Sequence, residues 1–353
     1  MKPAIQLTER GLYCPQGDFY IDPWKSVPRA VVTHAHSDHA CRGCGQYLTT
    51  PEGLAVLKVR MAADAVIETL PFGTSTHING VQLSLHPAGH VLGSAQVRIE
   101  HAGYVSVVSG DYKIEPDRTC TPFEPVRCHL FLTESTFGLP VYRWPAPGEV
   151  SSQINQWWAR NRSNGQSSVV YAYSLGKAQR ILAGLDAGIG PIITHGAVEP
   201  LNQAYRESGI SLPPTRTVSQ VDNAKEFKGA MVLAPPSAQG TPWMRRFGEV
   251  SQAFASGWMQ IRGTRRRRAL DRGFVVSDHA DWPGLLQAIE ATGAETVWVT
   301  HGYSAVLVRW LQERGTEAQV LETRFQGEAG DTAGIEEADK PEAGQTQPEV
   351  APS

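Results

Sequence analysis

The chain has few of the features that mark secreted or membrane proteins. Its 353 residues include only five cysteines, an odd number that gives no disulfide framework. No apolar run approaches the roughly 18 residues of a membrane span, and residues 1–9 lack the apolar region of a signal peptide. These absences predict a cytoplasmic protein with reduced thiols and no membrane partner.

The sequence also lacks internal repeats and a second CxxC pair. Cys41 and Cys44 form one such pair, but a separate tetrahedral zinc site would need two more ligands, so we expect reduced thiols in a loop. The chain does have size, because 41% hydrophobic residues can bury a substantial core and the length suits two domains.

The formal net charge is small, at −3, which taken alone argues against a nucleic-acid partner. However, residues 327–353 carry seven acids against one base, a charge of −6, so the remainder of the chain carries +3. This segment is also almost free of large apolar residues and cannot bury enough surface to fold. We therefore predict an acidic disordered tail at 327–353 and a mildly basic folded part.

Four chemically active side chains, those of His34, His36, Asp38 and His39, lie in one short stretch. On an extended segment, His34 and His36 point to the same side because they are two residues apart. The apolar run at 29–32 reads as a short buried strand that delivers the cluster at its carboxyl end. The pattern favours metal binding over a histidine-rich surface loop.

Further candidate ligands follow other predicted strands. The strands at 81–86, 104–108, 273–276 and 296–299 precede His90, Asp111, Asp278–His279 and His301, respectively. A metal needs about four ligands, and repeated strands ending in His or Asp are what a site at the carboxyl edge of a sheet requires. The sequence therefore predicts a complete metal site at such an edge.

The HxHxDH pattern at 34–39 resembles the signature of the metallo-β-lactamase superfamily, and the later strand-end motifs match that superfamily in order. The resemblance implies a metal-dependent hydrolase with two divalent metal ions. It places His34, His36 and His90 around one ion, Asp38, His39 and His301 around the other, and Asp111 between them.

The same resemblance suggests that Asp22 orients ligands from behind, although an ordinary turn aspartate before Pro23 fits its spacing equally well. Zinc suits shells of imidazoles and carboxylates, while manganese or iron could occupy the same ligands.

Asp111 and His301 are 190 positions apart, and much of this interval reads as a second globular unit. We expect strands at 168–173, 191–194 and 230–234 and a helix at 176–185. Strands that alternate with helical segments predict a parallel α/β domain. The Pro-rich stretch 139–147 should lead into this domain, and an arginine-rich segment should lead out of it.

The insertion narrows the resemblance to the β-CASP nucleases. Residues 133–138 resemble their motif A, 277–281 their motif B, and 300–302 their motif C. The fold implied is α/β, a metallo-β-lactamase αββα sandwich with an inserted α/β β-CASP domain. The expected divisions are 1–140 and 271–326 for the two parts of the core, 141–270 for the insertion, and 327–353 for the tail.

Family resemblance also implies a mechanism, in which a hydroxide that bridges the two metals attacks the phosphorus of a phosphodiester. Asp38 and Asp111 would act as catalytic metal ligands. His279 would lie near the departing oxygen as general acid or phosphate contact, with Glu134 orienting it. The alternative for His279 is a structural residue at a strand end.

Basic residues suggest where a nucleic acid would bind. Six arginines precede motif B: Arg262, Arg265, Arg266, Arg267, Arg268 and Arg272. Guanidinium groups match phosphate oxygens in pairs, so we interpret the run as a phosphate track rather than a solvated face. Lys177, near a predicted helix start, is either a further phosphate contact or a surface lysine.

Short sequence motifs bear on whether the substrate is DNA or RNA. A histidine at motif C, His301, is typical of RNA-processing β-CASP members. Residues 133–145 and 272–283, however, resemble bacterial ligase-associated DNA damage response exonucleases. That resemblance implies a DNA-repair exonuclease that trims DNA ends for an ATP-dependent DNA ligase, with a helicase as a further partner. A β-CASP ribonuclease and a non-catalytic DNA-end-binding scaffold are the alternatives.

Overall fold

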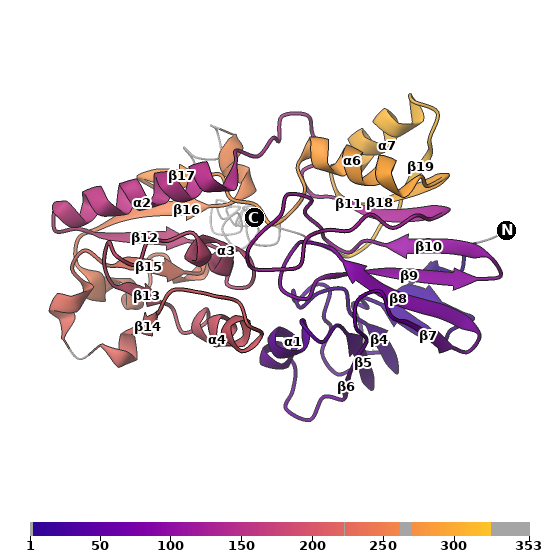
Figure 1. The fold of residues 1–353 in the computed structure, drawn as a ribbon, viewed down its shortest axis with the longest axis horizontal. Coiled ribbons are helices and arrows are strands. Elements are labelled where there is room, and N and C mark those ends of the chain that lie inside the picture. The colour runs from indigo at the N-terminus through magenta and orange to yellow at the C-terminus, as the bar shows by residue number, and fades with distance from the viewer. Residues whose placement is uncertain (1–2, 222, 262–269, 326–353) are drawn as a thin grey trace, which may run out of the picture.

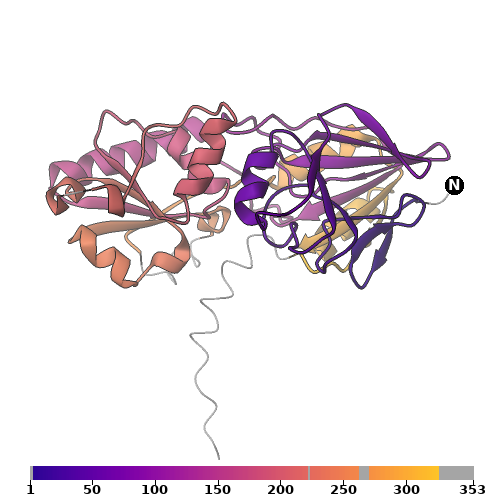
Figure 2. The same ribbon diagram turned by 90° about the horizontal axis from the view of Figure 1, so that it is seen from below.

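The computed structural model describes residues 3–221, 223–261 and 270–325. It is a mixed α/β structure with three β-sheets, here named A, B and C. Two parts lie side by side, one holding sheets A and B and the other sheet C (Figure 1). The same division is visible from below (Figure 2). The part with sheets A and B is formed by chain segments from both ends of the sequence, because sheet C is built from the middle.

Sheet A contains the first six strands in sequence order. These are β1 (Gln6–Thr8), β2 (Gly11–Cys14), β3 (Phe19–Ile21), β4 (Arg29–Val31), β5 (Gln46–Thr49) and β6 (Ile67–Thr69). The first three strands pair antiparallel and the last four pair parallel. Helix α1 (Leu54–Arg60) supplies the crossover between β5 and β6.

Sheet B has seven strands in the order β19-β18-β11-β10-β9-β8-β7. Their bounds are β7 (Ser75–Ile78), β8 (Val81–Pro87), β9 (Ala95–His101), β10 (Tyr104–Val108), β11 (Leu130–Ser135), β18 (Thr296–Gly302) and β19 (Glu317–Val320). Strands β10, β11, β18 and β19 pair parallel. Their carboxyl ends therefore meet at one edge of the sheet, which is where the predicted site residues are delivered.

Apolar side chains explain how these elements stack. Leu12, Phe19 and Ile21 of sheet A share a buried core with Leu83 and Val97 of sheet B. Burying one such side chain contributes about 1.5–3 kcal/mol. The other face of sheet B is covered by α6 (Trp282–Thr292) and α7 (Ser304–Gln312), and the other face of sheet A by α1. This part thus has four layers, helix, sheet, sheet and helix.

Sheet C has the order β14-β13-β15-β12-β16-β17, and every pairing in it is parallel. Its strands are β12 (Ser167–Tyr171), β13 (Ile192–Thr194), β14 (Arg216–Thr217), β15 (Met231–Ala234), β16 (Val250–Ala255) and β17 (Arg272–Phe274). Helices α2 (Pro147–Ser163) and α3 (Lys177–Ala183) pack on one face. The parallel α/β arrangement predicted for this interval is therefore present.

The other face of sheet C is covered by short turns rather than long helices. Phe227, Met244, Phe247 and Met259 pack there with the strands. They belong to 3-10 helices, whose bounds are Val218–Gln220, Ala224–Phe227, Pro236–Ala238, Pro242–Phe247 and Gly257–Gln260.

One predicted boundary differs from the strand pairing. The second part of the core was expected to begin at residue 271, but β17 (Arg272–Phe274) pairs in parallel with β16 and extends sheet C. The chain therefore leaves sheet C only after Phe274. The local sequence of β17 does not reveal this, because three residues with one large apolar side chain suit either sheet.

The two parts are joined by packing as well as by the chain. Helix α4 (Glu199–Glu207), from the part with sheet C, places Leu201 and Tyr205 in the same buried cluster as Val56 and Leu57 of α1. The Tyr205 hydroxyl accepts a hydrogen bond from the backbone N–H of Leu92, 3.1 Å away. In Figure 1, α4 and α1 lie next to each other between the two parts.

No helix within the described ranges is both long and apolar enough to cross a bilayer. All five cysteines, including Cys41 and Cys44, are free thiols.

Candidate metal centre

The predicted ligands converge at the carboxyl ends of strands. His34, His36 and His39 follow β4, His90 follows β8, and Asp111 follows β10. His301 lies near the end of β18, which pairs with β11 one strand away from β10. Residues far apart in the sequence therefore gather at one edge of the sheets.

The Asp111 carboxylate lies at the middle of this cluster. Its Oδ2 atom is 3.6 Å from His34 Nε2, 3.5 Å from His39 Nε2 and 3.9 Å from His90 Nε2. Its Oδ1 atom is 3.3 Å from His301 Nε2. One carboxylate thus faces four imidazoles, three of them through Oδ2 and one through Oδ1.

The two remaining predicted ligands adjoin this group. His36 Nδ1 is 3.1 Å from His90 Nε2, and Asp38 Oδ2 is 3.7 Å from His39 Nε2. Ligand atoms of His34, His36, His90 and Asp111 all lie within 4.8 Å of one another, and all four residues are buried. These buried side chains are close enough to hold a metal ion.

Several polar atoms of the cluster have no hydrogen-bond partner among the described residues. They are His34 Nε2, His39 Nε2, His301 Nε2 and Asp111 Oδ1. Leaving a buried polar atom unsatisfied costs about 1–3 kcal/mol, so four such atoms in one cluster need partners. Divalent cations accept lone pairs from imidazole nitrogens and carboxylate oxygens of this kind. The donor set therefore fits a metal.

Hydrogen bonds behind the ring atoms fix the tautomers. His90 Nδ1 donates to the Asp278 carbonyl at 2.8 Å, so its Nε2 keeps a lone pair toward Asp111. Asp22 accepts from the Thr33 backbone N–H at 2.7 Å, from Thr33 Oγ1 at 2.5 Å and from His39 Nδ1 at 2.7 Å. Asp22 therefore fixes the ring of His39 and the backbone of Thr33, with its own backbone at φ 44°.

The local environment sets the charge of these groups. Burial lowers the pKa of His34 and His90 well below the ordinary value, so both imidazoles are neutral. Burial alone would raise the pKa of Asp111, but His39 and other nearby imidazoles hold it well below its usual range. Neutral imidazoles and an ionised carboxylate are the states in which these side chains bind metals.

The pKa of His39 also reflects the negative charge of the carboxylates in the cluster. Its burial favours the neutral ring, but the carboxylates of Asp111, Asp38 and Asp22 raise its pKa to about 10. Side chains that stabilise an imidazolium so strongly would also attract a divalent cation.

Gly110 is required by the close approach of the Asp111 loop to β4. Its φ is +58°, and a Cβ atom there would lie 2.6 Å from Thr33 Oγ1 and 2.7 Å from Thr33 Cβ. Any larger residue would push Asp111 away from His34, since Thr33 and His34 are neighbours. The Gly-Asp sequence is thus a local condition for the cluster.

His279 and Glu134 form a buried pair next to the cluster. His279 Nδ1 is 2.8 Å from Glu134 Oε2 and 3.0 Å from Oε1, while the Tyr112 backbone N–H donates to Glu134 at 2.8 Å. The His279 ring lies 4.7 Å from the His90 ring, measured between centroids. Burial opposes its charge, yet Glu134 and Asp111 raise the pKa of His279 to about 10.

Lys177 does not lie where a phosphate contact was expected. Its side chain is only 3% exposed, and its Nζ is 3.3 Å from Asp278 Oδ1. A lysine buried against a carboxylate cannot reach a phosphate in solvent.

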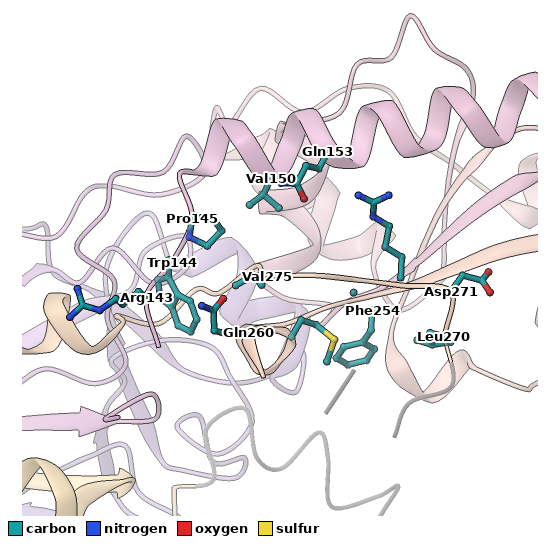
Figure 3. Close-up of a pocket in the computed structure, with 13 residues that line it drawn as sticks. Arg143, Trp144, Pro145, Val150, Gln153, Phe254, Gln260, Leu270, Asp271 and Val275 are labelled. Carbon is teal, nitrogen blue, oxygen red and sulfur yellow. The ribbon is translucent and has the colours of Figure 1, made fainter. Parts of the chain in front are cut away.

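The arginine run is only partly described. Arg262, Arg265, Arg266, Arg267 and Arg268 lie outside the described residues. Arg272 lines a pocket of about 590 Å³, with its guanidinium 5.2 Å from the Phe274 ring centroid. Figure 3 shows this pocket beneath α2, with Gln153 and Val150 above it and Phe254, Leu270 and Asp271 below. The role of the arginine run in binding nucleic acid stays a prediction.

The segment from Leu175 to Arg180 approaches the cluster in a way that the sequence did not indicate. The Leu175 carbonyl is 3.2 Å from His36 Nε2. Arg180 Nη2 donates to the His90 carbonyl at 3.0 Å, and Nη1 to the Ser277 carbonyl at 3.4 Å. A side chain that binds carbonyls of distant loops leaves no sequence pattern, so only the structure identifies this arginine.

Removing the Lys177 ammonium should destabilise the protein strongly. Burial alone would raise the pKa of Asp278, but Lys177 and nearby imidazoles hold it well below its usual range. In Lys177→Met that charge is buried without its partner, which costs about 3–5 kcal/mol. We expect a loss of this size in the free energy of unfolding from denaturant titration.

The control is Lys58→Met, which removes an exposed helical lysine and should change stability by less than about 0.5 kcal/mol. Adding Asp278→Asn to Lys177→Met should recover part of the loss. Equal stability of Lys177→Met and Lys58→Met would contradict the buried pair.

Comparison with known proteins gives relatives of two kinds. No family model matches the chain. A probable DNA ligase from Opitutus terrae is 32% identical over 91% of this chain. Endoribonuclease ysh1 from Aspergillus fumigatus is 34% identical over 34% of this chain. The chain spans only 31% and 14% of the lengths of these two relatives.

A crystal structure of a protein of unknown function from Enterococcus faecalis has a similar fold. Its TM-score is 0.54 at 12% identity, covering 84% of this chain and 79% of that one. The sequence relatives confirm the resemblance to the β-CASP nucleases.

Proposed function

We propose that this chain, a relative of the β-CASP nucleases, is a metal-dependent phosphodiesterase that trims DNA ends as an exonuclease. One observation carries the proposal. The buried Asp111 carboxylate faces four imidazole nitrogens at 3.3–3.9 Å, and several of these atoms lack another partner among the described residues. Such a set is suited to two metals, and two-metal sites serve the in-line cleavage of phosphodiesters.

For the fold, we propose two assignments. Sheets A and B with their outer helices form a metallo-β-lactamase αββα sandwich, and sheet C with its helices is the inserted β-CASP domain. The first part of the core would be residues 1–140. The insertion would extend from 141 to the end of β17 (Arg272–Phe274), four residues beyond the division expected from the sequence, because that strand pairs within sheet C.

In this proposal, one metal would be held by His34, His36 and His90, and the other by Asp38, His39 and His301, with Asp111 between them. Bound divalent ions, zinc or manganese, would lower the pKa of a water and neutralise charge on the phosphate. Asp22 would hold His39 in position through its 2.7 Å hydrogen bond.

The protein's own acid–base group would be His279. Glu134 holds its Nδ1 at 2.8 Å, which leaves Nε2 to face a departing oxygen. The carboxylate also keeps the imidazole protonated, since Glu134 and Asp111 outweigh the effect of burial on the pKa. A protonated His279 would donate to the leaving oxygen or bind the phosphate.

DNA is proposed as the substrate because the relative that matches 91% of this chain is named a probable DNA ligase. Nuclease and ligase sequences in one polypeptide would suit end-trimming before joining, which also makes an ATP-dependent DNA ligase a proposed partner, with a helicase as a further one. The alternative substrate is RNA, favoured by His301 and by the endoribonuclease relatives, which match a smaller share of the chain.

The test uses end-labelled single- and double-stranded DNA and RNA of matched sequence, with zinc or manganese supplied. We expect stepwise shortening of DNA that is lost in Asp111→Ala. Preferential cutting of RNA would move the chain to the ribonucleases. Binding of DNA ends with no cleavage of either polymer, in a metal-loaded protein, would instead indicate the non-catalytic scaffold.

A further inference from the structure

A second cavity adjoins the candidate metal centre at Asp38. It has a volume of about 560 Å³, and its lining includes Ser37, Asp38, Trp24 and the three arginines Arg42, Arg60 and Arg324. The arginines come from three distant places in the sequence: the loop after β4, the end of α1, and the segment after β19. Only the fold brings them together.

Two of the three guanidinium groups are anchored to the wall of the cavity. Arg42 Nε donates to the Arg60 carbonyl at 2.8 Å, at the end of α1. The Arg324 guanidinium lies 5.9 Å from the Trp24 ring centroid, and the Trp24 indole donates to the Glu9 carbonyl at 2.8 Å. These contacts hold the positive groups in place without neutralising them.

Carboxylate partners are missing from this cluster in the described part of the chain. Other arginines have them, since Arg98, Arg206, Arg216 and Arg309 each pair with a glutamate. No such pair involves Arg42, Arg60 or Arg324. The acid in the cavity lining is Asp38, whose carboxylate also faces the candidate metal centre, so positive charge predominates in the cavity.

We propose that this cavity binds a phosphate group of the nucleic-acid strand, beside the linkage that is cut. The inference rests on the proposed function and adds a second anchor point for its substrate. Arginine forks match phosphate oxygens and keep their charge at all relevant pH values. The exposed Ser37 hydroxyl can add a further hydrogen bond.

The position of the cavity gives the strand a direction across the site. The cavity adjoins Asp38, whose Oδ2 is 3.7 Å from His39 Nε2. His279 instead packs against His90, with ring centroids 4.7 Å apart. A strand with one phosphate in the cavity and its departing oxygen at His279 would therefore pass over Asp111. The phosphate is either the terminal phosphate of the strand or an internal one.

The test is the replacement of Arg42, Arg60 and Arg324 by glutamine, singly and together, in the full metal-loaded chain. Binding of fluorescent single-stranded DNA with cleavage-resistant phosphorothioate linkages is measured by anisotropy over a range of salt concentrations. Losing one phosphate contact should weaken binding and lower the slope of log affinity against log salt by about 0.7. The metal content should stay unchanged.

Each strand is prepared with a 5′-phosphate and with a 5′-hydroxyl. A loss confined to the phosphorylated strand would assign the cavity to a terminal phosphate, whereas equal losses would assign it to an internal one. The matched control is Arg127→Gln. Arg127 is exposed and precedes the start of β11, whereas Glu134 lies near the carboxyl end of that strand.

Two failures can be told apart. If the parent chain binds DNA and the triple variant matches Arg127→Gln in affinity and salt slope, the cavity proposal is overturned while the nuclease proposal stands. If the parent chain binds no nucleic acid at all, both are overturned.

Discussion

Asp111→Ala should abolish phosphodiester cleavage and release metal. The Asp111 carboxylate is the only described group that lies within 4 Å of the Nε2 atoms of His34, His39, His90 and His301 together. Without it, the two proposed metals lose their shared ligand and their negative partner. Removing an outer partner of a ligand typically costs 10–100-fold in metal affinity, so losing a bridging ligand should cost at least about 100-fold.

Metal bound per chain, measured by mass spectrometry after dialysis, and cleavage of end-labelled DNA give two separate readings. Asp64→Ala is the matched control, because Asp64 is an exposed aspartate outside the cluster. Circular dichroism checks that both variants fold. A variant at residue 111 that keeps its metal and its cleavage rate would refute the two-metal assignment.

The gathering of the ligands could be predicted because it follows from local rules. A short apolar strand before His34 and the strand that ends before Asp111 both form as expected, at Arg29–Val31 and Tyr104–Val108. Each of these strands places its motif at a carboxyl end, and the resemblance to the metallo-β-lactamase superfamily indicated which motifs belong together. Gly110 adds a condition that only the structure explains, through its approach to Thr33.

Features that depend on pairing across long distances could not be predicted. β17 belongs to sheet C because it pairs in parallel with β16, and the sequence of β17 alone does not predict this pairing. Lys177 was predicted to be either a phosphate contact or a surface lysine near a helix start, but Asp278, far along the chain, holds it in the interior. The cationic cavity of Arg42, Arg60 and Arg324 was missed for the same reason.

Hydrogen bonds from the part with sheet C also reach the candidate metal centre. Arg180 binds the carbonyls of His90 and Ser277, and the Asp278 carbonyl fixes the ring of His90. Arg180, from the part with sheet C, therefore helps to position both a proposed metal ligand and the loop that carries His279.

His279→Gln should lower kcat by about 10²–10⁴-fold while bound metal stays at the parent level. This is the range that a positioned acid–base group contributes, and His279 lies outside the proposed ligand set, with its Nδ1 atom held by Glu134. Glu134→Gln should also lower kcat, but by a smaller factor. The imidazole remains in this variant but loses the carboxylate that orients it and favours its protonated form. His77→Gln is the control, since His77 is exposed on β7.

A substrate with a sulfur leaving atom separates the two roles open to His279. Thiolates leave without a proton, so DNA with a bridging phosphorothiolate should be cut by His279→Gln at nearly the parent rate if the imidazole acts as an acid. If His279 contacts the phosphate instead, the variant should remain slow on both substrates. Unchanged kcat on ordinary DNA would reduce His279 to a structural residue at a strand end, and its 2.8 Å contact with Glu134 would then serve packing alone.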